Sequence, residues 1–373
     1  MTVVHKSITF IRKITRLHIT RIPIRCPVKC SAITGPVFEQ HDRKGHIECH
    51  DRLLAIIERL PADIPVLEPV IACREDVERV HKPGYLKWLE RQCVRNLNYS
   101  DITEVGCCGG YFAQNTFIAG FIDSNTYINP RSYEVALYAA GSAITAMERS
   151  LDGENCFALV RPPGHHAAAD WAMGFCLLNN TAIAAAKALT LVDRVAIIDW
   201  DAHHGNGTQD IFFGNDRVTY CSVHEEDVFP HTGTFEETGT GAGQGHTVNA
   251  PLQRGCTIGD YDAIFSEIFL PILKRAKPDC VIISAGQDIL SDDPVGNMAL
   301  APADVGYLTG LVLDTLSLPL ALVLEGGYGP SQPKAVASVF SALKGARDHG
   351  KIPEPLHNTR SRLALLKKIH KLF

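Results

Sequence analysis

Long apolar runs, a paired cysteine framework and internal repeats are all missing from the 373-residue sequence. No run of about 18 apolar residues occurs, which argues against a membrane-spanning helix. The 12 cysteines form no paired C-x-x-C motif, Cys26 and Cys30 being only a single C-x3-C, and we expect no secretory signal peptide. Scattered thiols of this kind are typical of a reducing compartment, so a cytoplasmic protein is expected. The 46% hydrophobic and 21% charged residues are typical of a folded globular chain.

Acidic residues are absent from positions 1–38, which hold seven Lys/Arg. Segment 351–373 holds six Lys/Arg and one Glu, so nearly all of the 41 acidic residues lie between the two ends. An acidic body argues against nucleic-acid binding. A basic, acid-free start is found in transit peptides, but 1–29 lacks a clean helical apolar stripe, and we interpret it as an extension outside the core fold. We expect one domain over 30–350 and a basic tail or helix at 351–373.

Short apolar runs alternate with longer, often Ala-rich stretches between the two ends. The runs expected as strands are 156–160, 195–198, 219–223, 280–284 and 320–324. The stretches expected as helices are 180–191, 261–276 and 302–316, with a basic amphipathic helix at 360–373 that packs on the body or frays. Wholly apolar strands separated by helices are typical of a parallel sheet with helices on both faces. The sequence therefore predicts a single α/β domain with a mostly parallel sheet.

Four of these predicted strands run directly into polar clusters. The clusters begin at Arg161, Asp199, Ala285 and Glu325. In open parallel sheets, ligands bind beyond the carboxyl ends of the strands. We therefore expect the four clusters to form one site at one edge of the sheet.

The second and third clusters contain candidate metal ligands. Asp201 and His203 are two residues apart, so in an extended backbone they face the same side, which Asp199 shares, and Asp288 comes from another strand end. Two carboxylates and one imidazole suit a divalent cation such as Zn²⁺, and three protein ligands leave a position open for water, as in catalytic sites. The alternative is that Asp199 and Asp201 only cap the following helix or pair with surface cations. His204 is expected to point elsewhere.

The first and fourth clusters contain candidate acid–base groups. The tandem His165 and His166 follow a Pro-Pro-Gly turn and suit general-base and general-acid roles. Asp199 could orient one of these histidines and Asn206 the other. A carboxylate raises the pKa of an imidazole, whereas a neutral amide does not. We therefore expect one mostly charged and one mostly neutral imidazole. Tyr328 follows two glycines and could hydrogen-bond a developing oxyanion.

Taken in order, these motifs resemble the zinc-dependent histone deacetylase and acetylpolyamine amidohydrolase superfamily over roughly residues 30–345. The tandem-His, D-x-D-x-H-H-G and G-G-Y motifs are highly specific. The matching stretches are G-H-I-E with R-L (45–48, 52–53), R-P-P-G-H-H-A (161–167), M-G-F-C-L-L-N-N (173–180), D-W-D-A-H-H-G-N-G-T-Q-D (199–210), F-P-H-T-G (229–233), A-G-Q-D (285–288), D-P-V-G (293–296) and E-G-G-Y-G (325–329).

The resemblance implies an arginase/deacetylase fold and hydrolysis of an acetyl or short acyl amide. In that mechanism His166 would be the general base and then protonate the leaving amine, His165 would support it electrostatically, and Tyr328 would stabilise the tetrahedral oxyanion. The zinc ligands would be Asp201, His203 and Asp288. A possible K⁺ site beneath the zinc would involve Asp199, Asp201, His203, Ser222 and Val223, with Asn206 in the second layer. The substrate channel would be lined by Gly174, Phe175 and Phe229, with Arg52 near an acetate exit.

The cues to the substrate disagree. Asn206 stands where class I histone deacetylases carry aspartate, so the chain is similar to class II and prokaryotic members. Val295 replaces the glutamate gatekeeper of polyamine-selective relatives, and Cys49 replaces a proline of the N-terminal signature. The run at 236–243, however, resembles bacterial acetylpolyamine amidohydrolases. Acetyl-lysine in proteins and acetylated polyamine both stay open, as do oligomeric state and the choice between Zn, Fe and Co.

Three rival functions share the motifs, the binding of acyl amines or the fold. An acetoin-utilisation-type deacetylase of small molecules shares the motifs. A non-catalytic acyl-amine binder would have lost a metal ligand or Tyr328, and neither is lost. An arginase-like ureohydrolase would need an aspartate at Gly205 to bridge two metal ions, so this alternative is disfavoured.

Overall fold

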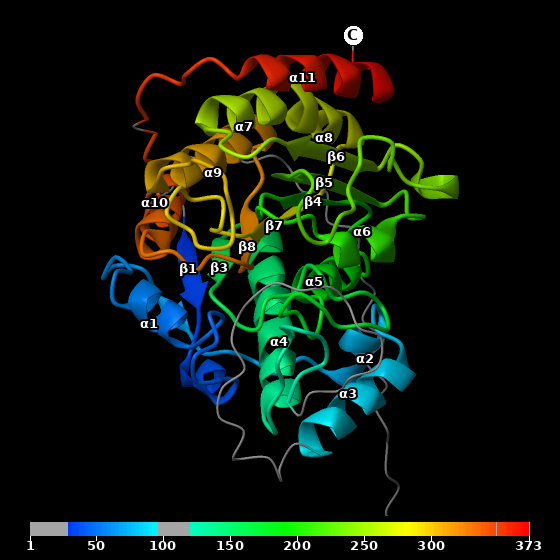
Figure 1. Ribbon diagram of the computed structural model, residues 1–373, viewed down its shortest axis with the longest axis vertical. Helices are drawn as coiled ribbons and strands as arrows, with labels where there is room; N and C mark the ends of the chain where they lie inside the picture. The colour runs from blue at the N-terminus through cyan, green and yellow to red at the C-terminus, as the bar shows by residue number, and fades with distance from the viewer. Residues whose placement is uncertain (1–28, 96–119, 348, 373) are drawn as a thin grey trace, which may run out of the picture.

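The computed structural model describes residues 29–95, 120–347 and 349–372, and within them eight strands form one sheet (Figure 1). The strands are β1 (Cys30–Ile33), β2 (Val66–Leu67), β3 (Asn155–Ala158), β4 (Val195–Asp199), β5 (Val218–Glu225), β6 (Thr247–Leu252), β7 (Cys280–Ala285) and β8 (Leu320–Leu324). Their order is β2-β1-β3-β8-β7-β4-β5-β6, and each pairing is parallel. The predicted α/β class is confirmed. The basic segment predicted as an N-terminal extension lies outside the described residues, except for its last position.

The five predicted strands are β3, β4, β5, β7 and β8, which form the contiguous centre of the sheet. Every residue of these strands is buried, as expected for a sheet covered on both faces. Three strands that lie toward the two edges, β1, β2 and β6, were not predicted.

Helices cover both faces of the sheet. The helices are α1 (Asp51–Ile57), α2 (Arg74–Glu78), α3 (Pro83–Arg95), α4 (Ser132–Leu151), α5 (Asn180–Ala188), α6 (Asn206–Phe212), α7 (Ile258–Ile264), α8 (Leu270–Ala276), α9 (Pro302–Leu316), α10 (Gln332–Leu343) and α11 (His357–Ile369), with 3-10 turns η1 (Pro36–Gln40) and η3 (Gly241–Gly243). α4 and α5 pack against β3, β4, β7 and β8. α9 and α10 form a second layer, in which Phe340 of α10 packs against Phe157 of β3.

Two predicted helices differ from the observed ones. The helix expected at 180–191 ends at Ala188. The helix expected at 261–276 begins earlier, because Thr257 and Asp260 form a capping box, and it contains the π-helical turn η4 (Phe265–Phe269). Pro271 follows this turn and has no N–H for the usual helical hydrogen bond, which explains the local widening. The helix predicted at 302–316 is confirmed as α9.

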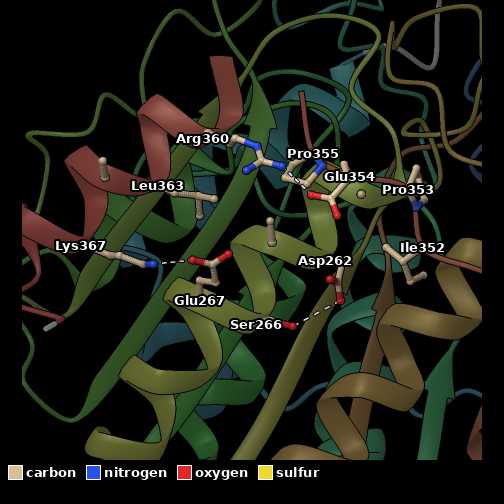
Figure 2. Close-up of a pocket in the computed structure, with 13 residues that line it drawn as sticks. Asp262, Ser266, Glu267, Ile352, Pro353, Glu354, Pro355, Arg360, Leu363 and Lys367 are labelled. Atoms are coloured by element: carbon tan, nitrogen blue, oxygen red, sulfur yellow. Dashed lines mark hydrogen bonds and ion pairs between the residues drawn. The ribbon is translucent and has the colours of Figure 1, made fainter. Parts of the chain in front are cut away.

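The C-terminal helix predicted at 360–373 corresponds to α11, which begins and ends earlier, at His357 and Ile369, and lies across α7 and α8 at the top of Figure 1. Leu366 is buried against the body, Lys367 pairs with Glu267, and Arg360 pairs with Glu354 at 2.5 Å. These pairs border a surface groove of about 520 Å³, shown in Figure 2, which includes none of the predicted site residues. Among the described residues, none of the helices combines the length and apolar character that a bilayer crossing requires.

Candidate active site

The polar clusters at the strand ends meet around one cavity of about 140 Å³. Because β3, β8, β7 and β4 are neighbouring parallel strands, their carboxyl ends lie at the same edge of the sheet. The cavity is lined by Asn125, Pro163, His165, His166, Gly174, Phe175, Asp201, His203, Phe229, Asp288, Val295, Gly326 and Tyr328. Asn125, Pro163 and Gly326 were not predicted as site residues.

The three candidate metal ligands lie together in the cavity. His203 Nδ1 is 2.8 Å from Asp288 Oδ2 and 3.3 Å from Asp201 Oδ1, and the three ligand atoms lie within 4.8 Å of one another. Ligands about 2.0–2.2 Å from a tetrahedral zinc are themselves about 3.3–3.6 Å apart, so the residues fit the size of a zinc site. His204 points away, its Nδ1 being 2.7 Å from Thr232 Oγ1.

Backbone N–H groups hold the two carboxylates of the triad. The N–H of Ala202 donates to Asp288 Oδ1 at 2.8 Å, and the N–H of Gly326 donates to Asp201 Oδ2 at 2.9 Å. The other oxygen of each carboxylate, Asp288 Oδ2 and Asp201 Oδ1, faces His203. Gly286 makes this approach possible, because a Cβ there would lie 2.1 Å from Asp201 Oδ2.

Each of the tandem histidines has a different partner. His165 Nδ1–H donates to Asp199 Oδ2 at 3.1 Å, and Tyr220 also donates to that oxygen, at 3.0 Å. His166 Nδ1 lies 2.8 Å from Asn206 Oδ1. An amide oxygen can only accept, so Nδ1 of His166 carries its proton, and Nε2 of the neutral ring is free to take up another.

The electrostatic environments of the two imidazoles diverge accordingly. Burial alone would lower the pKa of His165, but the charges of Asp201 and Asp199 raise it to about 10. For His166, burial and then the charges of His165 and His203 lower the pKa well below its ordinary value. The pKa values of the two imidazoles are therefore shifted in opposite directions.

Glu325, just beyond β8, holds the tandem-His loop in place. Its Oε2 accepts hydrogen bonds from the N–H groups of Gly164 (2.6 Å) and His165 (3.1 Å), and its Oε1 accepts from Ser284 (3.0 Å) and Thr181 (3.3 Å). Burial raises the pKa of this carboxyl to about 7. Only the tyrosine of the same motif was predicted to have a role. The sequence signal for Glu325 was an acidic residue directly after an apolar strand.

Tyr328 lines the cavity with Arg52 behind it. The Arg52 guanidinium carbon lies 4.5 Å from the centroid of the Tyr328 ring, and its nitrogens donate to the carbonyls of Gly327 and Glu325, both at 2.7 Å. Burial raises the pKa of the Tyr328 phenol well above its ordinary value, so the hydroxyl keeps its proton and can donate it in a hydrogen bond.

Two aromatic rings border the cavity as expected for a channel. The Phe229 ring lies 5.0 Å from the His166 ring, and the Phe175 ring lies 5.8 Å from the Tyr328 ring. Gly174 stands between these groups with φ +56, and a Cβ there would lie 2.5 Å from His166 Cδ2. Only glycine fits both this backbone conformation and this space.

Two of the residues matched to a potassium site, Asp201 and His203, belong to the triad, and the other three come from β4 and β5. Asp199 of β4 is in register with Ser222 of β5, which precedes Val223. Ser222 Oγ is 2.9 Å from His224 Nδ1. Asp199 is fully buried and also accepts from the N–H of Asp201 at 3.2 Å.

A buried ion pair between Arg161 and Glu48 supports the loop before the histidines. This role was not predicted from the sequence. Arg161 binds Glu48 through two hydrogen bonds of 2.8 and 2.7 Å, and it donates to the Tyr127 hydroxyl at 2.6 Å. Burial alone would raise the pKa of Glu48, but Arg161 lowers it well below its usual range. Glu48 also accepts from Arg52 at 3.1 Å, so the pair links the His loop to the Tyr328 loop.

A parallel α/β sheet with a possible metal-binding triad and tandem histidines at its carboxyl edge defines a class of amide hydrolases. A model of the histone deacetylase domain matches residues 46–343, and the chain belongs to that family. It is 36% identical over 344 residues to a probable deacetylase of Archaeoglobus fulgidus, which covers 87% of this chain and 89% of that protein. Histone deacetylase 18 of Arabidopsis thaliana is also 36% identical, over 333 residues, 85% of this chain and 47% of that protein, so the chain spans about half of that relative.

A solved structure agrees with these sequence matches. The crystal structure of the HDA15 HD domain superposes with a TM-score of 0.81 at 31% identity, over 93% of this chain and 96% of that one. The expected family, the arginase/deacetylase fold and the class of enzyme, a deacetylase, are therefore confirmed.

Proposed function

We propose that this chain is a zinc-dependent deacetylase that removes acetyl or short acyl groups from amines. The observation that carries the proposal is the meeting of Asp201, His203 and Asp288 with the tandem histidines in one cavity. Zinc, when bound by these three residues, would supply Lewis-acid polarisation of the amide carbonyl and activation of a water molecule. The proposal also includes a K⁺ ion near Asp199, Ser222 and Val223. It further includes a cytoplasmic location.

The two histidines would divide the proton transfers. His166, neutral and with Nε2 free, would take a proton from the attacking water and return it to the leaving amine. His165, held charged by Asp199 and Asp201, would stabilise negative charge that develops next to it. The separation of roles follows from the two Nδ1 partners.

Tyr328 and the aromatic walls would act on the rest of the substrate. The protonated phenol of Tyr328 would donate a hydrogen bond to the developing oxyanion. Phe175 and Phe229 would enclose the alkyl chain of the amine and exclude water from the bond that is cleaved. Arg52, behind Tyr328, would lie near the route by which acetate leaves.

Two substrate classes fit this site. Acetyl-lysine in a protein and an acetylated polyamine both present an acetyl amide on a slim alkyl chain. Val295 lines the cavity and has no charge to bind a second ammonium group, which favours acetyl-lysine. A small-molecule deacetylase of the acetoin-utilisation type is the alternative.

A substrate panel with the purified, zinc-loaded protein tests the proposal. Acetyl-lysine peptides are compared with N-acetylputrescine, N-acetylcadaverine and N-acetylspermidine. Tyr328→Phe and His166→Ala should each lower turnover by about two orders of magnitude or more, because each removes a group that acts in the transition state. Full activity in both variants would reject the assigned roles.

A further inference from the structure

The backbone of the Tyr328 loop is held by hydrogen bonds on both of its sides. Arg52 takes the carbonyls of Glu325 and Gly327 on one side. On the other side, Asp293 Oδ2 accepts hydrogen bonds from the N–H of Tyr328 itself at 2.6 Å and from the N–H of Gly329 at 2.9 Å. Asp293 therefore binds the backbone of the residue whose phenol is proposed to act on the substrate.

The other oxygen of Asp293 holds a second wall of the cavity. Oδ1 accepts from the N–H of Val295 at 2.9 Å and from the N–H of Gly296 at 3.3 Å. Val295 lines the cavity with Tyr328. Asp293 is only 8% exposed, and its four N–H partners come from two loops that follow different strands, β7 and β8.

We infer that Asp293 is a positioning residue that sets the Tyr328 phenol against the Val295 wall; this inference rests on the proposed function. An ionised carboxylate offers about four acceptor positions, which match its four N–H donors. An asparagine at 293 would turn an NH₂ group toward one of the two loops, whichever way the amide is oriented. The backbone N–H groups of that loop would then lose their acceptor and face another donor, so the loop should shift. A displacement of a catalytic group by about 1 Å can lower the rate roughly 100-fold.

A double-mutant cycle tests this inference. Asp293→Asn, Tyr328→Phe and the double variant are compared with wild type and with Asp292→Asn, a matched control that changes the exposed neighbouring carboxylate. We expect Asp293→Asn to lower kcat by about 10- to 100-fold with KM within about threefold, because Tyr328 acts mainly in the transition state. In the Tyr328→Phe background the same change should alter kcat by less than about threefold, since the phenol it positions is already gone. Asp292→Asn should match wild type.

Two further measurements separate positioning from general damage. Zinc per chain should stay unchanged in Asp293→Asn, since the three metal ligands are intact, and loss of zinc would overturn the inference. If Asp293→Asn does not fold, Asp293→Glu, which keeps the charge but lengthens the side chain, takes its place in the cycle.

The outcomes also separate this inference from the proposed function. The positioning role is overturned if the kcat losses of the two single variants multiply in the double variant, or if Asp293→Asn keeps full activity. Neither result would affect the proposed role of Tyr328. Full activity of Tyr328→Phe alone would instead reject the role of Tyr328 in the proposed function.

Discussion

Replacing Asn206 with aspartate should move the pH range in which the enzyme works. Asn206 Oδ1 lies 2.8 Å from His166 Nδ1, so a carboxylate there places a negative charge directly beside this imidazole. Two unit charges about 4 Å apart interact by about 4 kcal/mol at an effective dielectric constant of about 20, which corresponds to about 3 pKa units. Neighbouring opposite charges shift pKa values by about 1–3 units. We therefore expect the pKa of His166 to rise by that amount.

The shift has a definite sign in a rate profile. Because neutral His166 is the proposed base, activity is lost as pH falls through its pKa, and raising that pKa moves the acidic limb of kcat/KM to higher pH. The measurement is kcat/KM on an acetyl-lysine peptide across the acidic and neutral range. Asn206→Ala is the control, since it removes the hydrogen bond without adding charge and should not move the limb upward. An acidic limb of Asn206→Asp that stays in place or moves to lower pH would refute the reasoning.

Three further changes follow from the same geometry. Gly174→Ala should strongly reduce kcat/KM, because its Cβ would press on His166 at 2.5 Å; wild-type kinetics in the folded variant would contradict this. Glu48→Ala should lower the free energy of unfolding, measured in urea at pH 7, by about 3–5 kcal/mol, because it leaves the buried Arg161 charge with only the more distant Asp42 carboxylate, at 3.5 Å. The difference between variant and wild type should shrink below about pH 4, because the wild type then begins to lose the stability that its depressed Glu48 pKa provides. A destabilisation of less than about 1 kcal/mol at pH 7 would contradict the stabilising role of the ion pair. Chelation should remove activity and lower Tm, and Zn²⁺ at 1,000 times its Kd should restore about 4 kcal/mol; a Tm unaffected by chelation would argue against metal binding at the triad.

The centre of the sheet could be predicted from the sequence, but its edges could not. The central strands are short continuous apolar runs, because both of their faces are covered. By contrast, β6 contains Asn249 and Pro251, and β2 has only two residues, Val66 and Leu67. Edge strands tolerate proline because one of their two sides makes no ladder hydrogen bonds. Their sequences therefore carry little periodic signal.

The cavity residues and their supports also differ in how far sequence could predict them. The candidate ligands and histidines stand in dense motifs beside predicted strands, and the sheet-edge rule brings those motifs together. Asp293, Glu325 and Glu48 act instead by accepting hydrogen bonds from backbone N–H groups or from a distant arginine, and such partners are specified only by the path of the chain. Spacing along the sequence contains no information on which N–H groups a loop leaves unpaired.

The charge balance of the buried site explains why so many acids can lie in it. Asp199, Asp201, Asp288 and Glu325 are each at most 1% exposed, and burial raises the pKa of both Asp288 and Glu325 to about 7. Buried carboxylates are costly unless they are paired or protonated. The carboxylates raise the pKa values of His165 and His203, and two imidazolium charges cannot balance four ionised acids. A divalent cation at the triad would let these acids ionise, so binding it should release protons, and its affinity should weaken as pH falls.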